Sequence, residues 1–432
     1  MKNFKILLFW WILLILGNTF ASAYLLWFKS ADNTIENIQK IEEKHKIKLP
    51  LVWFIFDPRG PHVINTINEI PETLWTTRIY HITISPNNFS AKEVAEGIFD
   101  KQYLEFFQSV KDNNLKVVFR TMHEMNGGRY PWSSHPKNFK KARIRVRNLS
   151  RELGLSTENI LFNFSVNHRD MPTKEIPSQK AKLIPCQLSW KEKIWCYTFE
   201  DYYPWDKYVD IIWFSFYNRG KGFADRKRLT PNQIVNERWR NPLQRIKAFN
   251  KPIMIDEVGT TSVWYDEVFD YNISREVYKT NYKAKNTWLR QLQQLLWKEQ
   301  SIIGTVYFNV DYTKWLSNRL IWETDRSVID LDTNKVYETI FTLLKNSDDL
   351  HLRCPLLNLF GVWIMEINGK DKFIPIKYIT TINRLHSIIN KTSYNYEKKN
   401  SILKSLWTKE ITKIFPNLSK KEWDDIIKIL SL

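Results

Sequence analysis

The sequence predicts an α/β fold of the (β/α)8 TIM-barrel type, followed by a small, mostly helical C-terminal extension. Short apolar runs alternate with stretches of helical periodicity over much of the chain. The runs are continuously apolar, which is typical of parallel strands buried on both faces. A doubly wound sheet is the alternative, but no strand run is followed by the Gly-rich turn that such sheets use to bind phosphate.

The predicted elements alternate in order along the chain. The strand runs are residues 24–28, 50–56, 78–85, 116–120, 160–166, 208–216, 252–255 and 303–309. Apolar residues at helical spacing predict helices over residues 34–45, 103–112, 139–153, 242–249 and 282–299. We expect a last helix over residues 330–345 to close the barrel.

Residues 1–22 are predicted to be a signal peptide or a membrane anchor. Two lysines precede an apolar run over residues 6–17, and Ala21-Ser22-Ala23 fits a signal-peptidase site. Apolar residues resume at 24–28, so the segment is also nearly long enough to cross a bilayer. Either alternative implies export: the protein is secreted or periplasmic, or attached to the membrane by this segment.

Residues 23–345 are predicted to form the barrel, and residues 346–432 form an extension with no recognisable chemistry. In the extension, an apolar run over residues 356–365 precedes Asn368-Gly369 and Lys-rich amphipathic segments. Ser419 and Glu422 have the spacing of a helix capping box.

The composition constrains partners and cofactors. The chain has 64 basic and 46 acidic residues, a formal net charge of +18. This excess could attract an acidic polymer, but it is spread along the chain without a nucleic-acid-binding motif, so we expect no nucleic acid partner. No CxxC pair suggests zinc, and we expect a monomer without metal or cofactor. Cys186 and Cys196 could close a ten-residue loop in an oxidising compartment.

Two glutamates stand where barrel enzymes carry their catalytic groups. Glu124 follows the strand run 116–120, and Glu257 follows the run 252–255. The carboxyl ends of barrel strands form the active-site face. Glycoside hydrolysis needs two carboxyl groups across that face, one to protonate the leaving oxygen and one to attack the anomeric carbon. A single glutamate here would more often form an ion pair at the rim, whereas two among aromatic residues predict catalysis.

Residues 123–132, HEMNGGRYPW, resemble the HEMNG-x-WYPW signature of glycoside hydrolase family 26, best known for β-mannanases. Weaker similarities to the family follow in the same order over about residues 23–345. They include residues 96–104, Arg120, residues 163–167, 203–218, 251–259 and 306–315.

This resemblance implies a role for each matching residue. Glu124 resembles the acid/base and Glu257 the nucleophile of a retaining mechanism, with the carboxyl groups about 5–5.5 Å apart. Tyr217 resembles the tyrosine that hydrogen-bonds the nucleophile. The expected substrate-binding residues are His123, Tyr217, Trp132, Arg129, Asn167, Tyr307 and Trp315, and Trp205 is a weaker candidate for a sugar platform.

Three departures from the family pattern leave the substrate open. Arg129 and Tyr307 stand where tryptophan is common, and Trp205 stands where glycine is usual. The resemblance favours a mannan-like polysaccharide, as for an endo-β-1,4-mannanase, whereas Arg129 would suit an acidic glycan. Arg129 could instead pair with an acidic side chain at the rim. Other interpretations are a membrane-anchored glycan-binding protein and a role in processing the cell's own exopolysaccharide.

Overall fold

The structure of the chain is a computed structural model, and it divides into two compact units, Met1–Leu356 and Leu357–Leu432. It describes residues 26–29, 35–46, 49, 51–59, 77–171, 184–187, 193–218, 229–237, 240–260, 263–264, 279–280, 282–299, 301–308, 356–367, 370–379, 381–382 and 419–431. The predicted signal peptide or anchor and the predicted helix over residues 330–345 lie outside these residues. No helix within them is long and apolar enough to cross a membrane.

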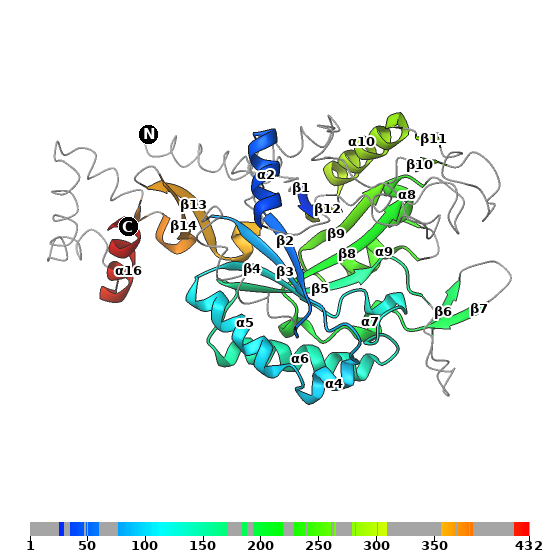
Figure 1. The fold of residues 1–432 in the computed structure, drawn as a ribbon, viewed down its shortest axis with the longest axis horizontal. Helices are drawn as coiled ribbons and strands as arrows, with labels where there is room; N and C mark the ends of the chain where they lie inside the picture. The colour runs from blue at the N-terminus through cyan, green and yellow to red at the C-terminus, as the bar shows by residue number, and fades with distance from the viewer. Residues whose placement is uncertain are drawn as a thin grey trace, which may run out of the picture. The chain divides into compact units, whose positions relative to one another are not determined.

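Eight parallel strands form the sheet of the first unit (Figure 1). They are β1 (Leu26–Lys29), β2 (Leu51–Phe56), β3 (Ile79–Ile84), β4 (Lys116–Thr121), β5 (Ile160–Asn167), β8 (Ile211–Asn218), β9 (Ile253–Thr260) and β12 (Ile302–Phe308). Their order around the sheet is β1-β12-β9-β8-β5-β4-β3-β2, and a single register pair, Phe28 with Val52, closes the sheet between β1 and β2. The predicted α/β class with a curled parallel sheet is confirmed.

Each predicted strand run overlaps one of these strands. The runs could be recognised because strands that are buried on both faces are rich in apolar residues. All six residues of β3 and all six of β4 are buried. The prediction was wrong for the end of β9, which continues to Thr260 instead of stopping at residue 255. Glu257 therefore lies within a strand and not in the loop after it.

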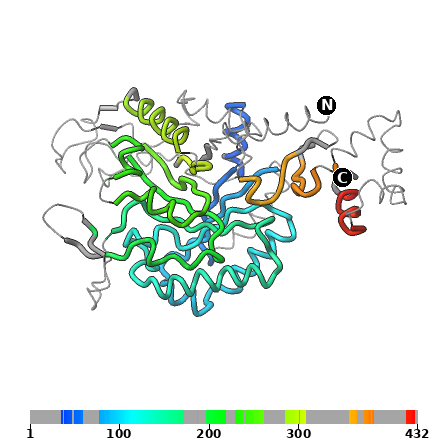
Figure 2. Tube along the Cα trace, turned by 180° about the vertical axis from the view of Figure 1, so that it is seen from behind, coloured from blue at the N-terminus to red at the C-terminus, as the bar shows by residue number. Residues whose placement is uncertain are grey.

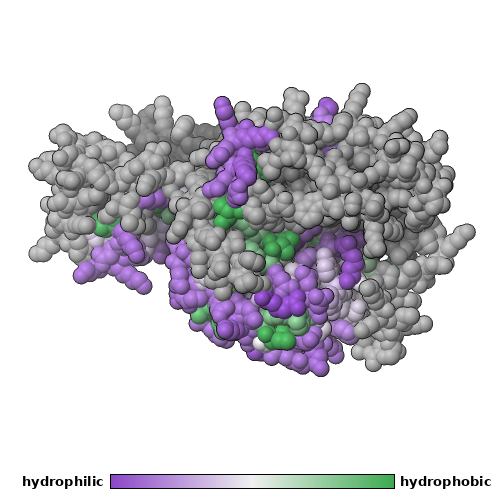
Figure 3. All heavy atoms as spheres, in the orientation of Figure 1, coloured by the Kyte–Doolittle hydropathy of each residue, from purple (hydrophilic) through white to green (hydrophobic). Residues whose placement is uncertain are grey.

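Helices α4 (Ala91–Glu96), α5 (Asp100–Asp112) and α6 (Pro136–Glu152) pack against one side of the sheet (Figures 1 and 2). Aromatic side chains fill this layer: the ring of Phe119 on β4 lies 5.3 Å from Phe106 of α5 and 5.1 Å from Phe162 of β5. The outer side of these helices is mainly hydrophilic (Figure 3). This amphipathic division buries the apolar faces of the helices against the sheet.

The other α-helices that the structure describes in this unit are α2 (Ile35–His45), α7 (Phe199–Tyr202), α8 (Pro231–Val235), α9 (Pro242–Lys247) and α10 (Tyr282–Lys298). Two antiparallel hairpins were not predicted. They pair β6 (Ile184–Gln187) with β7 (Lys193–Cys196), and β10 (Val263–Trp264) with β11 (Lys279–Thr280). Strands of two to four residues are too short to give a periodic signal in the sequence.

In the second unit, β13 (Val362–Ile367) pairs with β14 (Lys370–Pro375) in an antiparallel hairpin. Helix α16 (Lys420–Ser431) begins at the predicted capping box, because Ser419 N donates to Glu422 Oε2 at 3.0 Å and Glu422 N donates to Ser419 Oγ at 3.3 Å. The capping prediction is confirmed.

Candidate active site

Glu124 lies in the connection between β4 and the short 3-10 helix η1 (Met125–Gly127). Met122 and Glu124 both have φ 49, in the left-handed region that non-glycine residues adopt at an energetic cost. The backbone N–H of Glu124 donates to the carbonyl oxygen of Ser165 on β5 at 2.9 Å. This unusual backbone turns the glutamate side chain, which is almost fully buried, toward its neighbours on the sheet.

Three donors hold the Glu124 carboxyl group. Asn167 Nδ2, at the end of β5, donates to Oε1 at 3.0 Å, and the hydroxyl of Ser215 on β8 donates to the same oxygen. Arg129 Nη2 donates to Oε2 at 2.5 Å. The candidate acid/base is therefore fixed by two strands and by its own loop, and Asn167 and Arg129 reach it directly.

Glu257 lies in a β-bulge of β9. Ile255 and Val258 are three residues apart, but their partners on β8, and likewise on β12, are only two apart. The extra residue sits at Asp256–Glu257. Successive side chains of a regular strand point to opposite faces, yet here one guanidinium, that of Arg120 on β4, bonds to both carboxyl groups. The bulge thus directs the candidate nucleophile and its neighbour toward the same cation.

Both oxygens of Glu257 are engaged. Arg120 donates from Nη1 and from Nη2 to Oε1, each at 3.0 Å, and the hydroxyl of Tyr217 donates to Oε2. Arg120 is itself held, because its Nε donates to Thr83 Oγ1 at 2.8 Å and its guanidinium lies 4.4 Å from the ring of Trp53. The contact that the resemblance implied between Tyr217 and Glu257 is present.

Asp256 is a second, fully buried carboxyl group next to Glu257. It accepts hydrogen bonds from Arg120 and from the hydroxyl of Ser165, and His81 Nδ1 lies 3.8 Å from its Oδ1. Burial raises the pKa of Asp256 to about 6, against the lowering effect of Arg120 and with a further raising effect of Glu257.

No role for Asp256, Ser165 or Ser215 was predicted from the sequence. A signal was available, because polar residues at every second position of an otherwise apolar barrel strand mark its inward face. Ser165 and Asn167 on β5 have this spacing, as do Ser215 and Tyr217 on β8.

The charges of the two glutamates act on the same neighbour. Burial is the main reason why the pKa of Tyr130 is raised, and both Glu124 and Glu257 add to this effect. The fold therefore brings the two carboxylates, which are far apart in the sequence, into one electrostatic environment. Among the described residues, no group of three His, Cys, Asp or Glu side chains is placed to hold a metal ion.

His123 is buried next to this pair, with Nε2 3.0 Å from the hydroxyl of Tyr130. The prediction of Trp132 as a sugar platform was wrong. Its side chain is fully buried, stacks on the Tyr130 ring at 4.6 Å, and donates from Nε1 to the carbonyl oxygen of His123 at 2.8 Å. Trp132 therefore supports the loop and has no exposed face for a sugar.

Two other aromatic predictions also change. Tyr307 is fully buried, and its hydroxyl accepts from the N–H of Thr260 at 3.2 Å, so it supports the end of β9 and is not available to substrate. Trp205 is 58% exposed, but it precedes the amino end of β8 and its ring lies 5.9 Å from Lys140 Nζ of α6. It is therefore in the outer helical layer and not at the carboxyl ends of the strands. Trp315 lies outside the described residues.

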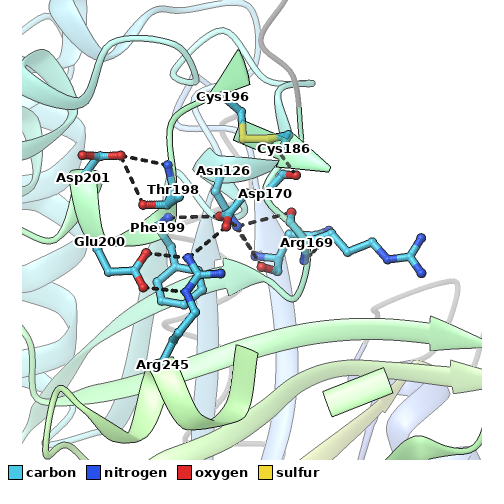
Figure 4. The surroundings of a disulfide bond; sticks show 11 residues. Asn126, Arg169, Asp170, Cys186, Cys196, Thr198, Phe199, Glu200, Asp201 and Arg245 are labelled. Atoms are coloured by element: carbon cyan, nitrogen blue, oxygen red, sulfur yellow. Dashed lines mark hydrogen bonds and ion pairs between the residues drawn. A yellow bond between two sulfur atoms is a disulfide. The ribbon is translucent and has the colours of Figure 1, made fainter. Parts of the chain in front are cut away.

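A disulfide joins Cys186 of β6 to Cys196 of β7 beside the site (Figure 4). Cys186 Sγ lies 3.2 Å from the carbonyl oxygen of Asp170, and the Asp170 side chain accepts from Asn126 Nδ2 at 2.9 Å. Asn126 is two residues after Glu124. Hydrogen bonds through Asp170 thus link the β6–β7 hairpin to the loop that carries Glu124.

No protein-family model and no curated protein matches this chain. Among solved structures, it is similar to the catalytic domain of the Bacillus sp. JAMB-750 GH26 endo-β-1,4-mannanase, with 15% identity, a TM-score of 0.49 and coverage of 77% of this chain and 88% of that one. It is also similar to the Bacillus subtilis mannanase BCman (12%, 0.45, 76% and 87%) and to a double mutant of the Cellulomonas fimi endo-β-1,4-mannanase (10%, 0.47, 79% and 76%).

Proposed function

We propose that this chain is a retaining glycoside hydrolase of family 26, built on a complete (β/α)8 barrel, that cleaves internal β-linkages of a polysaccharide with a mannan-like backbone. One observation carries the proposal. Two glutamates at the positions of the family's acid/base and nucleophile come from the loop after β4 and from the bulge within β9, and a separate set of donors orients each one. A carboxyl group that served only to stabilise the barrel would not need this paired orientation.

The reaction follows from these contacts. Glu257 attacks the anomeric carbon while Glu124 gives its proton to the glycosidic oxygen, and the bond to the leaving sugar breaks. Arg120 and Tyr217 keep Glu257 ionised and aimed. Glu124, now a carboxylate, then takes a proton from the water that releases the sugar from Glu257. Configuration at the anomeric carbon is retained after two inversions.

A panel of β-linked polysaccharides, assayed for new reducing ends, tests the proposal. We expect cleavage of at least one polymer with a β-1,4-linked mannose-type backbone, and NMR of the early products should show the retained anomer. Inverted products, or no cleavage of any polymer in a panel that also holds β-1,3-xylan and mixed-linkage glucan, would contradict it.

We also infer that the protein acts outside the cytoplasm as a monomer. The disulfide between Cys186 and Cys196 supports export, because such bonds persist in oxidising compartments. The signal-like residues 1–22 support it independently. Mass spectrometry of the protein from membrane and soluble fractions separates the alternatives: a mature form lacking this segment indicates cleavage, and an intact Met1 in the membrane fraction indicates an anchor.

A further inference from the structure

Arg129 blocks the one oxygen of Glu124 that can serve as the acid. Oε1 accepts from Ser215, which is fully buried, and from Asn167, which is partly buried at the end of β5. Oε2 is bound by Arg129, whose side chain is 53% exposed whereas that of Glu124 is 3% exposed. The oxygen on the solvent side is therefore the oxygen that carries the ion pair.

This arrangement suits a carboxylate and not a carboxylic acid. All three groups that bond to Glu124 donate to it, and the Arg129 guanidinium lies 2.5 Å from Oε2, where an acid proton would have to sit. The first chemical step needs a proton on Glu124. Arg129 must therefore leave Oε2 before the glycosidic bond can be protonated.

A neutral glycan offers Arg129 no carboxylate to replace the ion pair with Glu124 that it would lose. Hydroxyl groups of a sugar can accept its hydrogen bonds, but unlike a carboxylate they carry no negative charge to pair with the guanidinium. The planar guanidinium is shaped to grip a carboxylate with two parallel bonds. A carboxylate on the substrate, within reach of the rim, would take over Arg129 and free Oε2 at the same time.

We infer that the substrate is an acidic glycan, with a uronic-acid carboxylate on the sugar next to Glu124 on the leaving-group side. This inference rests on the proposed function. Binding would exchange the Glu124–Arg129 pair for a substrate–Arg129 pair, and Glu124 would take up the proton that it then delivers to the glycosidic oxygen.

The charges around the pair agree with this exchange. The titratable groups nearby are His123 and Tyr130 on the same loop, Arg120 on β4, and Asp256 and Glu257 on β9. Arg120 is shared by the last two carboxyl groups, so it is not available to the substrate. Once Glu124 is protonated, Arg129 is the cation of this group that is left to pair with an incoming anion.

The test compares two polymers that differ only at C6: β-1,4-mannan and β-1,4-linked polymannuronate. We expect wild-type kcat/KM to be at least about tenfold higher on the acidic polymer, and Arg129→Gln to lose about 10–100-fold on it, the worth of a charge-assisted bond. On mannan the same variant should raise kcat/KM above that of the wild type, because Arg129 no longer has to leave Oε2 of Glu124. Arg145→Gln is the matched control, since Arg145 also makes a 2.5 Å ion pair, with Asp100, and is 41% exposed. It removes the same charge and should change neither polymer's kcat/KM.

Proton uptake gives a readout besides rate. In the Glu257→Ala variant, calorimetry in two buffers of different ionisation enthalpy should show about one proton taken up with an oligomannuronate and none with a mannan oligosaccharide. Glu124→Gln should abolish that uptake. Preferred cleavage of mannan with equal losses in Arg129→Gln and Arg145→Gln would overturn the inference and leave the proposed function standing. Failure to cleave either polymer or any other β-glycan would contradict both this inference and the proposed function.

Discussion

The hydroxyl of Tyr217 donates a hydrogen bond to Oε2 of Glu257, across the boundary between β8 and β9. The carboxyl group that would attack the sugar is thus held at one oxygen by a neutral donor and at the other by the Arg120 guanidinium. Because the tyrosine bond is made to a charged acceptor, it contributes to both the ionisation and the aim of the nucleophile.

Removal of that hydroxyl should slow catalysis without unfolding the barrel. A hydrogen bond to a charged group is worth about 1.5–3 kcal/mol, so Tyr217→Phe should lower kcat by about 10–100-fold. The ring stays, and the thermal unfolding midpoint should therefore change little. Steady-state kinetics and a melting curve together check this, and a wild-type kcat in the variant would show that the bond has no catalytic role.

Replacement of each of the two glutamates by alanine should lower activity to a different extent. Glu124→Ala should lose about 10²–10⁴-fold in activity, the usual contribution of a general acid–base group. Glu257→Ala should lose more, because no covalent intermediate can form. Added azide should restore turnover of Glu257→Ala with a glycosyl azide of inverted configuration, since the small anion then attacks directly. Full activity in either variant would refute these assignments.

Asp256 should influence the pH dependence of the reaction. Asp256 and Glu257 share one guanidinium, and burial together with the Glu257 charge raises the pKa of Asp256 to about 6. Asp256→Asn removes the like charge and leaves the Arg120 guanidinium to Glu257 alone. Protonation of Glu257 should therefore need a lower pH. The acidic limb of the kcat/KM profile should move down by about one pH unit, while the basic limb stays in place.

Asp100→Asn is the control for that shift, because Asp100 pairs with Arg145 on the helical layer. Its acidic limb should coincide with that of the wild type. An unmoved limb in Asp256→Asn would mean that Asp256 serves the packing of the bulge alone.

The disulfide should contribute to stability more than to chemistry. Closing a loop of this length is worth about 2–3 kcal/mol in the chain-entropy model, so the Cys186→Ser and Cys196→Ser double variant should unfold at a lower urea concentration. Its kcat should change little, since Asp170 keeps its hydrogen bonds from Asn126 and Arg245. Cys354→Ser leaves the disulfide intact and serves as the control. An unfolding midpoint equal to that of the wild type would contradict the prediction.

Much of the fold could be predicted because parallel strands leave a local signature. Strands such as β3 and β4 are buried at every position, and a run rich in apolar and β-branched residues of this kind can be recognised without knowing its partners. The carboxyl ends of such strands meet at one edge of the sheet. Glu124 and Glu257 could therefore be assigned to one site from their order along the chain, and Tyr217 followed from the family resemblance.

The remaining features of the site depend on contacts between segments that are far apart in the sequence. Nothing near residue 256 predicts a bulge, because the bulge is defined by the register of β9 against β8 and β12. Ser215 reaches Glu124 across 91 residues, and Trp132 is buried only because the loop folds its ring onto Tyr130. The sequence by itself determined which residue types stand at the strand ends. Only the tertiary structure decided which of them touch, and so placed Arg129 on the acid/base, because hydrogen bonds and ion pairs act over a few ångströms in space and not along the chain.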